Sequence, residues 1–201
     1  MKPPCLELQA LSTSHLSSLS LSLQPGEIVS LNGASGAGKS LLLRAICDLI
    51  EHQGEILLNG VSHLELPAHQ WRRSVGLLTA ESYWWHEHIG DHFEGDITEP
   101  LSQLGLSAAI LQQDVSQCST GERQRLALIR LLQNQPKVLL LDEPTSGLDK
   151  ATRVKVEALI RQYVSQQQAA VIWVSHDIEQ CQRIGSRHLQ IVDGCVTEGV
   201  S

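Results

Sequence analysis

The residues best suited to chemistry form one short segment of the sequence. Its residues fit the pattern of Gly, four residues, Gly, Lys and then Ser or Thr, which cradles phosphate groups. Glycines let the backbone turn tightly and bring several N–H groups close to a phosphate. Lys39 can reach the β- and γ-phosphates of a nucleotide, and the Ser40 hydroxyl can ligate Mg²⁺. We therefore predict a nucleotide site formed by Gly33, Ala34, Ser35, Gly36, Ala37, Gly38, Lys39, Ser40 and Leu41.

A second candidate group follows the unbroken apolar run 138–141, which predicts a central parallel strand buried on both faces. The run ends in Asp142 and Glu143, and carboxylates are costly to place there unless they have a role. Open α/β sheets bind ligands at this end of their strands. Asp142 would hold Mg²⁺, directly or through water, and Glu143 would orient or deprotonate an attacking water. The alternative is an ordinary turn at the end of a strand.

His176 follows another apolar run, 170–174, and would share an edge with Glu143 if the two strands are parallel. A single histidine is usually structural, but at this edge we favour a contact to the γ-phosphate.

Residues 118–125 lead into an apolar helix and place Ser119 and Thr120 at its N-terminus. This geometry suits an anion, although taken alone it is an ordinary helix cap. A thiol at a helix N-terminus has a lowered pKa, so we predict that alkylation of Cys118 inhibits the protein. The alternative is a buried, inert cysteine.

Composition limits the remaining possibilities. The 201 residues predict a single domain over 1–201, and the net charge of −7 argues against binding a nucleic-acid backbone. Five cysteines without a Cys-x-x-Cys pair suit a reduced cytosolic protein better than a disulfide framework. No apolar run approaches the length of a membrane helix, so we predict a soluble, cytoplasmic domain.

These chemical groups need elements to position them. Alternating leucines predict strands in the N-terminal region, and Pro25-Gly26 and Asn59-Gly60 predict turns. Gly54 is expected to break the chain. The expected strands are 6–9, 19–23, 28–31, 55–58, 75–78, 138–141 and 170–174, with a closing hairpin over 187–198. The expected helices are 40–46, 101–113, 126–132 and a polar, exposed helix over 151–168.

The segment 79–100 gathers aromatic, histidine and acidic residues, and we interpret it as an exposed contact surface. His86, His88 and His92 have the chemistry of metal ligands, but their spacing matches no known motif. Solvated or packed histidines are the favoured interpretation.

With these groups in order, the chain resembles the ATP-binding subunit of an ABC (ATP-binding cassette) transporter. The resemblance covers nearly the whole length. It rests on the phosphate loop, on residues 118–122 in place of the family signature Leu-Ser-Gly-Gly-Gln, on 138–143 followed by 146–149 (Ser-Gly-Leu-Asp), and on His176. The half from Ile129 to His176 is most similar to small ATPases of iron or metal exporters.

The resemblance implies an α/β fold with a P-loop NTPase core and a mostly parallel central sheet. It also implies an N-terminal antiparallel β subdomain and a small helical subdomain over about 82–125. Two copies would sandwich two ATP molecules head to tail, with Ser119 and Gly121 of one copy touching the γ-phosphate bound by the other. Lys39, Glu143 and His176 would be catalytic, and Asp149 would link the two sites. The homodimer would drive a separate integral membrane subunit from the cytoplasmic face of the membrane, and metal-ion export is one cargo class that the resemblance implies.

The sequence departs from the family pattern at several positions. Thr120 and Glu122 replace Gly and Gln of the signature, and an added carboxylate near a triphosphate should weaken closure by repulsion unless it points away or Arg123 neutralises it. Ala80 stands where the family has a Mg²⁺-binding Gln, and the neighbouring Glu81 could serve as the ligand. No aromatic residue precedes Trp71 to stack on adenine, so His15 is the substitute unless base discrimination is weak.

In that case ATP and GTP should bind within about tenfold of each other in a competition assay. A much larger preference for ATP would contradict this prediction.

Two other functions fit the same sequence. The first is an ABC-type ATPase that acts as an assembly or regulatory factor, with the Trp84–Trp85 segment docking on a soluble partner. The second is a nucleotide-binding module with little hydrolysis, which the altered signature and the missing Gln favour. The intact Lys39, Asp142 and Glu143 argue against the second.

Overall fold

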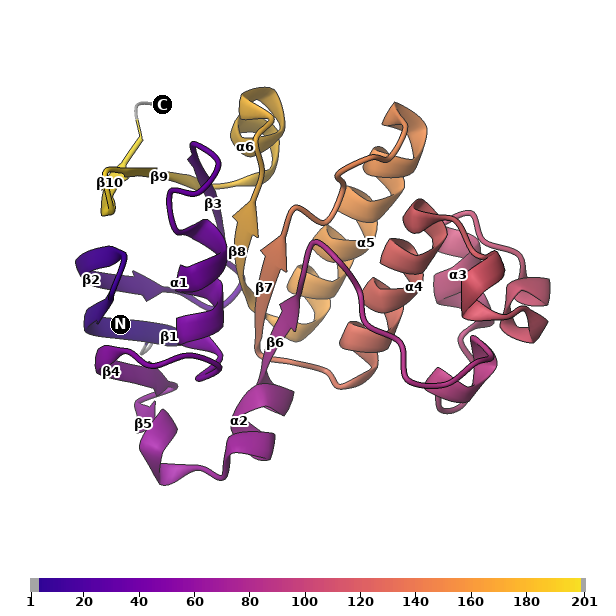
Figure 1. Ribbon diagram of the computed structural model, residues 1–201, viewed down its shortest axis with the longest axis horizontal. Coiled ribbons are helices and arrows are strands. Elements are labelled where there is room, and N and C mark those ends of the chain that lie inside the picture. Colours follow the sequence, from indigo (N-terminus) through magenta and orange to yellow (C-terminus); the bar gives the residue numbers. More distant parts are fainter. Residues whose placement is uncertain (1–3, 200–201) are drawn as a thin grey trace.

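A six-stranded sheet occupies the centre of the structure, a computed structural model that describes residues 4–199 (Figure 1). Its strands are β3 (Ile28–Gly33), β6 (Val75–Leu78), β7 (Val138–Asp142), β8 (Ala170–Val174), β9 (Arg187–Val192) and β10 (Cys195–Glu198). They lie in the order β10-β9-β3-β8-β7-β6. All neighbours are parallel except β9 and β10, which form the predicted antiparallel hairpin. The mostly parallel central sheet is confirmed.

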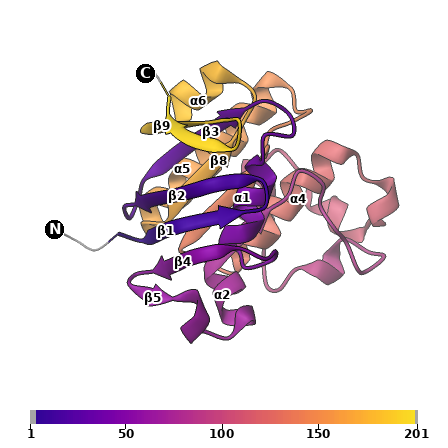
Figure 2. The ribbon, with the colours of Figure 1, turned by 60° about the vertical axis from the view of Figure 1, so that its left-hand side comes forward.

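A second, antiparallel sheet is built mainly from the N-terminal quarter of the chain (Figure 2). Its strands are β1 (Leu6–Thr13), β2 (Leu16–Leu23), β4 (Gln53–Leu58) and β5 (Val61–Ser62). They lie in the order β2-β1-β4-β5. The alternating leucines explain this sheet, because they turn one face of β1 and β2 toward the core and leave the other face polar.

Gly54 lies inside β4, so the prediction that it breaks the chain is wrong. Its φ is 90°, and a Cβ at this position would be 2.4 Å from the carbonyl oxygen of Ala10. The register between β1 and β4 shifts at this point, between Gln9 and Ser12. The glycine therefore accommodates a bulge instead of ending the strand.

Helices cover the central sheet on both faces. They are α1 (Lys39–Ile46), α2 (Ala68–Ser74), α3 (Thr98–Gln103), α4 (Thr120–Gln133), α5 (Lys150–Gln167) and α6 (Ile178–Ile184). Single turns of 3-10 helix are η1 (His63–Glu65), η2 (Gly90–His92), η3 (Ala108–Gln112) and η4 (Val115–Gln117). Within residues 4–199, none of the helices combines the length and the apolar character that crossing a membrane requires.

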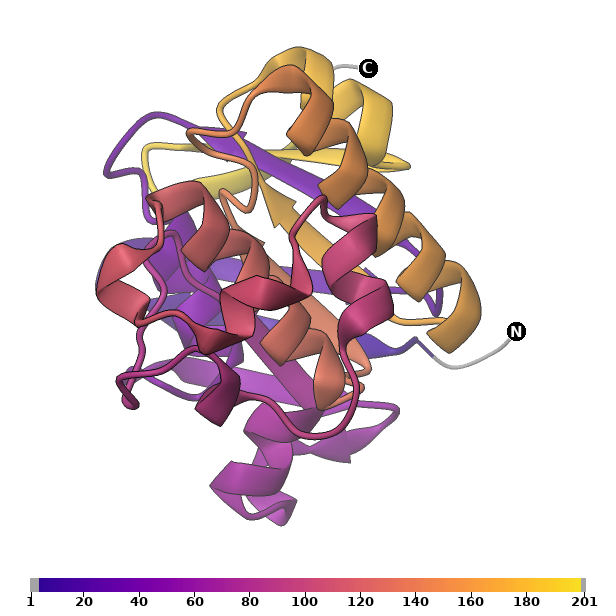
Figure 3. The same ribbon diagram turned by 90° about the vertical axis from the view of Figure 1, so that its right-hand side faces the viewer.

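The central sheet separates two hydrophobic cores, because successive side chains of a strand face opposite sides. On β7, Val138 and Leu140 pack in the same core as α1 and the antiparallel sheet. Leu139 and Leu141 pack on the other side with residues of α3, α4 and α5. These three helices face the viewer in Figure 3. Every residue of β7 and β8 is buried, which explains why both strands are continuous apolar runs.

Two predictions for the helical region are wrong. The single helix expected over 101–113 is split into α3 and η3, and Gly105 with a φ of 69° lies between them. The helix expected to be exposed, α5, buries one side in the second core through Val156, Leu159, Ile160, Tyr163 and Val164. In both segments apolar side chains pack into the second core. This packing depends on neighbouring elements, which the local sequence pattern does not show.

Candidate nucleotide-binding site

The phosphate loop connects the end of β3 to the start of α1, as the sequence predicts. Gly36 and Gly38 have φ values of 79° and 101°, in the region that favours glycine. Lys39 is buried, and its Nζ donates hydrogen bonds of 2.8 Å to the carbonyl oxygens of Gly33 and Ala34. The loop thus holds a buried cation beside the N-terminus of a helix, which is an arrangement that binds phosphate.

The carboxyl ends of β3, β7 and β8 meet at one edge of the sheet because these strands are parallel neighbours. Asp142 lies opposite Val174, so the residues that follow the two strands approach each other. Glu143 Oε1 is 2.5 Å from His176 Nε2. The prediction that Glu143 and His176 share an edge is therefore confirmed.

The backbone of Glu143 is itself unusual. Its φ is 51°, and its N–H donates a 3.2 Å hydrogen bond to the carbonyl oxygen of Val174. A residue other than glycine in this conformation costs about 1–3 kcal/mol, and such residues concentrate at functional sites. Glu143 thus has a rare backbone conformation at the point where its carboxylate meets His176.

Ser40 and Asp142 offer the oxygen ligands that suit a magnesium ion. Ser40 lies in the first turn of α1, and Asp142 is 7% exposed at the end of β7. Mg²⁺ prefers hydroxyl and carboxylate oxygens and keeps several of its waters, so two protein ligands suffice when phosphates supply others. These residues therefore fit Mg²⁺ bound to a nucleotide.

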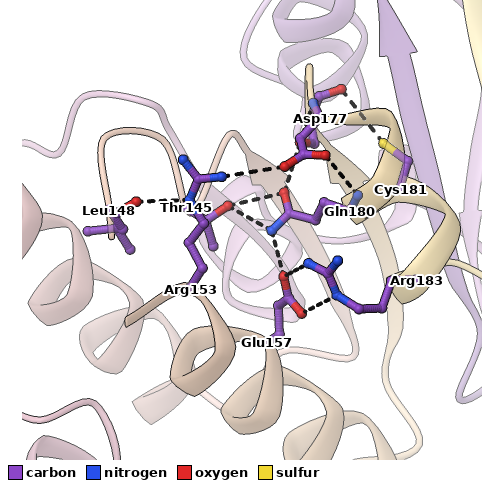
Figure 4. Close-up of polar contacts among 9 residues, drawn as sticks. Thr145, Leu148, Arg153, Glu157, Asp177, Gln180, Cys181 and Arg183 are labelled. Atoms are coloured by element: carbon purple, nitrogen blue, oxygen red, sulfur yellow. Dashed lines mark hydrogen bonds and ion pairs between the residues drawn. The ribbon is translucent and has the colours of Figure 1, made fainter. Parts of the chain in front are cut away.

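A buried polar network braces the turn that carries His176 (Figure 4). Gln180, which is 1% exposed, accepts a 2.8 Å hydrogen bond from Ser175 Oγ. Its Nε2 donates to Thr145 Oγ1 at 2.9 Å. Ser175 precedes His176, and Thr145 lies in the turn after Glu143. One glutamine thus holds together the two turns that present the Glu143–His176 pair.

Glu157 and Arg183 extend this network to α5 and α6. Glu157 Oε1 accepts hydrogen bonds from Gln180 Nε2 at 2.8 Å and from Arg183 Nη2 at 2.7 Å. Burial favours the neutral acid, but the hydrogen bonds from Arg183 and Gln180 outweigh it and lower the pKa of Glu157. The carboxylate is therefore ionised at neutral pH. None of these residues was predicted from the sequence.

Ser119 caps the N-terminus of α4, and Glu122 completes a reciprocal capping box. The Glu122 Oε2 atom accepts hydrogen bonds from the Ser119 hydroxyl at 2.7 Å and from the Ser119 N–H at 2.8 Å. These hydrogen bonds lower the pKa of Glu122. Arg123 donates to the carbonyl oxygen of Cys118 at 2.7 Å and does not pair with Glu122. The negatively charged Glu122 carboxylate is thus hydrogen-bonded directly to Ser119.

Gly121 and Asp149 belong to neighbouring turns of the same chain. A Cβ on Gly121 would be 2.9 Å from Leu148 Cδ2, so the start of α4 packs against the turn that follows Glu143. Asp149 caps α5, accepting from the Thr152 N–H at 3.0 Å. The central sheet separates α4 from α1, the helix that follows the phosphate loop of the same chain (Figure 1).

The prediction of a reactive Cys118 is wrong. The side chain is 4% exposed, and burial, together with the nearby Glu122 charge, raises the pKa of the thiol. Of the five cysteines, only Cys195 is exposed. The burial agrees with the alternative of a buried, inert cysteine.

Glu81 is exposed in the loop after β6. Within residues 4–199 its carboxylate makes no ion pair, and only its carbonyl oxygen accepts a hydrogen bond, from Thr79 Oγ1. Its role as a Mg²⁺ ligand stays a prediction. Sequence reasoning missed Gln124, a buried residue of α4 whose Nε2 donates to the Thr79 carbonyl at 3.1 Å.

The aromatic and histidine segment is partly exposed and partly packed. Tyr83 and Trp85 are 73% and 66% exposed, as expected of a contact surface. His92, by contrast, is buried and stacks edge-on against Trp84 and Trp85, with ring centroids 4.8 Å and 4.7 Å away. His88 pairs with Asp114 at 2.7 Å, and His86 lies against His92. His86 and His88 are exposed and His92 is packed, which favours solvated or packed histidines over metal ligands.

His15 lies exposed in the turn between β1 and β2. The next residue, Leu16, is in contact with the phosphate loop, because a Cβ on Gly38 would be 3.0 Å from its Cδ2. The residue that follows His15 thus lies at the loop, and base stacking by His15 stays a prediction.

Comparison with known proteins agrees with this geometry. The family model described as "ABC transporter" matches residues 16–146. The chain is 35% identical over 178 residues to the probable iron export ATP-binding protein FetA of Escherichia coli, covering 82% of this chain and 79% of that protein. It is 32% identical over 209 residues to the phosphate import ATP-binding protein PstB of Aeropyrum pernix, covering 91% and 83%.

A solved structure shares the fold. It is a dimeric ATP-binding cassette in a post-hydrolysis state with ADP and Pi, and it matches with a TM-score of 0.83 at 24% identity, over 96% of this chain and 97% of that chain. The antiparallel sheet and the mostly parallel sheet with its helices are those of the ABC ATPase fold. The segment matched by the family model includes the phosphate loop, Asp142 and Glu143. The chain therefore belongs to the ABC transporter family, as an ATP-binding subunit of the ABC-type ATPase class.

Proposed function

We propose that this chain hydrolyses ATP as a head-to-tail homodimer and thereby powers a separate integral membrane subunit. The observation that carries the proposal is the contact of 2.5 Å between Glu143 and His176 at the sheet edge where β3 delivers the phosphate loop. In this position a carboxylate can orient an attacking water while the neighbouring imidazole contacts a terminal phosphate.

Each residue has a distinct role in this mechanism. Lys39 and the backbone N–H groups of residues 33–41 bind the β- and γ-phosphates. Glu143 orients the attacking water and accepts its proton, while His176 steadies the γ-phosphate. Mg²⁺, when held by Ser40 and Asp142, supplies positive charge that offsets the charge developing on the phosphate oxygens.

The signature residues act on the nucleotide of the other copy. Ser119 is exposed at the N-terminus of α4, where the helix dipole and unpaired N–H groups favour an anion. It lies across the central sheet from α1, so a second copy must supply the phosphate that it contacts. Asp149, at the start of α5, would lie between the two sites. The related dimer with ADP and Pi supports this arrangement.

A hollow of about 350 Å³ beside β6 is the proposed seat of the membrane subunit. Its exposed apolar rim includes Leu49, Tyr83 and Trp85. The guanidinium of Arg130 lies 4.3 Å from the ring centroid of Trp84 and 4.5 Å from that of Trp85, which rigidifies the rim. Docking here would place the chain on the cytoplasmic face of a membrane and leave Glu81 beside the partner.

The cargo is chosen elsewhere. One relative is named for iron export and another for phosphate import, at similar identities to this chain. We assign the choice of cargo to the membrane subunit and test metal-ion export first, since FetA is named for it.

Steady-state ATPase activity with Mg²⁺, measured over a range of protein concentrations, tests the proposal. We expect activity to rise faster than linearly with protein, because a dimer forms the site. Glu143→Gln should lower turnover by about a hundredfold or more while ATP still binds. Glu99→Gln, an exposed change on α3, serves as the matched control.

Two outcomes would point elsewhere. Tight ATP binding without turnover, at any concentration and with membranes added, would identify a nucleotide-binding module. Full ATPase activity combined with co-purification of only water-soluble partners would identify an assembly or regulatory factor.

A further inference from the structure

A cluster of ionisable side chains lies away from the phosphate loop, where the chain leaves α1 and enters β4. It consists of Asp48, His52 and His63, and no step of ATP hydrolysis uses it. One candidate ligand atom from each residue lies within 4.8 Å of the other two. Asp48 follows the end of α1, His52 directly precedes β4, and His63 begins η1.

The imidazole of His52 has an unexplained buried nitrogen. The side chain is 7% exposed, and its Nδ1 has no hydrogen-bond partner among the described residues. Its Nε2 faces Asp48 Oδ1 at 3.8 Å, which is too long for a hydrogen bond. A buried polar atom without a partner is destabilising unless something binds it.

His63 is held in the orientation of a metal ligand. Its Nδ1 lies 3.3 Å from the carbonyl oxygen of Ile56, which leaves Nε2 as the available nitrogen. Metal-binding histidines commonly donate their other ring N–H to a backbone carbonyl in this way. The ring is packed between His52, 5.1 Å away, and Trp71, 5.8 Å away, measured between centroids.

Asp48 has the most exposed side chain of the three residues, so it can most easily move toward a bound ion. Its side chain is 43% exposed, with Oδ1 toward His52 and Oδ2 3.8 Å from Arg72 Nη2. Arg72 also donates to the Asp48 carbonyl oxygen at 2.9 Å, so the guanidinium is anchored there. The positive charge of Arg72 repels a cation that is bound by electrostatic attraction alone. Coordination by the histidine nitrogens would therefore supply most of the binding.

We propose that Asp48, His52 and His63 bind a divalent transition-metal ion, for which Zn²⁺ is the best fit. Mg²⁺ and Ca²⁺ prefer sets of oxygen ligands, whereas two imidazoles and one carboxylate suit zinc. Zinc bonds of about 2.0–2.1 Å place tetrahedral ligand atoms roughly 3.4 Å apart, so ligand atoms that now lie up to 4.8 Å apart must approach by up to about 1.4 Å.

Solvent reaches this cluster directly. A hollow of about 380 Å³ opens beside His52, lined by Ser12, Thr13, Ser14, Glu51, His52 and Gln53. Asp48 and His63 do not line this hollow, so the ion would enter past the half-exposed side chain of Asp48, where a water can complete a fourth coordination position. Bound metal would tie the end of α1, whose other end carries Lys39, to the antiparallel sheet.

Titration of the full-length, nucleotide-free protein with Co²⁺ and Zn²⁺ tests the proposal. We expect one Co²⁺ per chain with visible absorption bands of a four-coordinate site, displaced by Zn²⁺. Asp48→Asn and His52→Gln should each weaken binding by at least about tenfold. The matched control is His69→Gln, an exposed histidine on α2, and His88→Gln controls for the other histidine cluster.

Asp48→Asn keeps the size of a half-exposed side chain and so tests the site even if the buried His52→Gln variant fails to fold. Retained ATP binding and circular dichroism would show that each variant is folded. Co²⁺ binding that is unchanged in Asp48→Asn, or that falls equally in His88→Gln, would overturn the proposal, as would the absence of saturable binding.

Discussion

Glu122 illustrates how one side chain can serve folding and oppose function. Its carboxylate completes the capping box of α4 through two hydrogen bonds from Ser119. A negative charge in the first turn also stabilises the helix dipole. In the proposed dimer, however, the same charge would face the triphosphate held by the other copy.

We predict that Glu122→Gln strengthens ATP-driven dimerisation. Glutamine preserves the capping box but removes the charge at both sites of the dimer. Relief of about 1 kcal/mol of repulsion per site, or about 2 kcal/mol per dimer, should tighten the dimer roughly thirtyfold. Sedimentation equilibrium with ATP, in a Glu143→Gln background that prevents hydrolysis, measures this change.

Glu99→Gln is the control for that experiment, because Glu99 is also an acidic residue in the first turn of a helix. It should leave dimerisation unchanged. A dimer that is equally strong or weaker in Glu122→Gln would show that the charge is not near the nucleotide.

Single residues were predictable from the sequence where their chemistry is local. The phosphate loop and the pair Asp142–Glu143 follow apolar strands directly, so pattern and position agree. Cys118 was misjudged because its burial depends on η4 and α4 packing together. The sequence leaves the partner of Glu122 open, since Arg123 directly follows it and Ser119 lies three residues before it.

At the scale of elements, the contact between α5 and α6 stands out. Glu157 is nearly buried on α5 and pairs with Arg183, whose side chain is 51% exposed on α6. Gln180 joins this pair to the turns that present Glu143 and His176 (Figure 4). The two helices thus support the site without touching it.

We predict that Glu157→Gln lowers the free energy of unfolding by about 1–3 kcal/mol at pH 7. The loss is smaller than for a fully buried ion pair, because Arg183 can turn to water. The pKa of Glu157 is lowered by folding, so its contribution is present above the unfolded pKa, about 4.3, and is lost as the pH falls through the folded pKa.

Urea unfolding at pH 7 and near pH 4 measures this dependence. The difference between the wild type and Glu157→Gln should shrink at the lower pH. Glu179→Gln, an exposed change on α6, should show no such difference. A pH-independent gap would mean that packing, and not ionisation, accounts for the effect.

The sequence predicted strands better than helices. A buried parallel strand such as β8 is a continuous apolar run, which is visible without knowing its neighbours. The short helices α2 and α6 were missed because seven residues give too little periodicity to detect. Gly54 looked like a break because the bulge at Ala10 that requires it comes from another strand.

For the whole molecule, the central sheet sets the possible assembly. It places the phosphate loop with one core and the signature helix α4 with the other. A complete site in the proposed mechanism therefore needs two chains. The order of the motifs along the sequence does not indicate this separation, because the position of the sheet between α1 and α4 is a property of the tertiary structure.

Mixing two inactive variants tests the shared site. Lys39→Ala should disable the phosphate loop, and Ser119→Asp should repel phosphate while keeping a good helix cap. In a mixture, half of the dimers are heterodimers with one intact site of two, so up to roughly a quarter of the wild-type ATPase activity should return.

Lys39→Ala mixed with the double variant Lys39→Ala/Ser119→Asp leaves no site intact and should stay inactive. Activity in the first mixture no higher than the sum of its components would argue against sites shared between copies.

The contact between Gly121 and Leu148 would couple the turn after Glu143 to the start of α4. Leu148 ends a compact turn that starts at Glu143, whose carbonyl oxygen accepts the Ser146 N–H at 3.1 Å. Loss of the terminal phosphate would first change the contacts of Glu143. Through this turn the change would reach Gly121, in the signature segment that contacts the nucleotide of the other copy. Hydrolysis at the phosphate loop of one copy would thus alter the site at the phosphate loop of the other copy. The two sites would then hydrolyse ATP at different times.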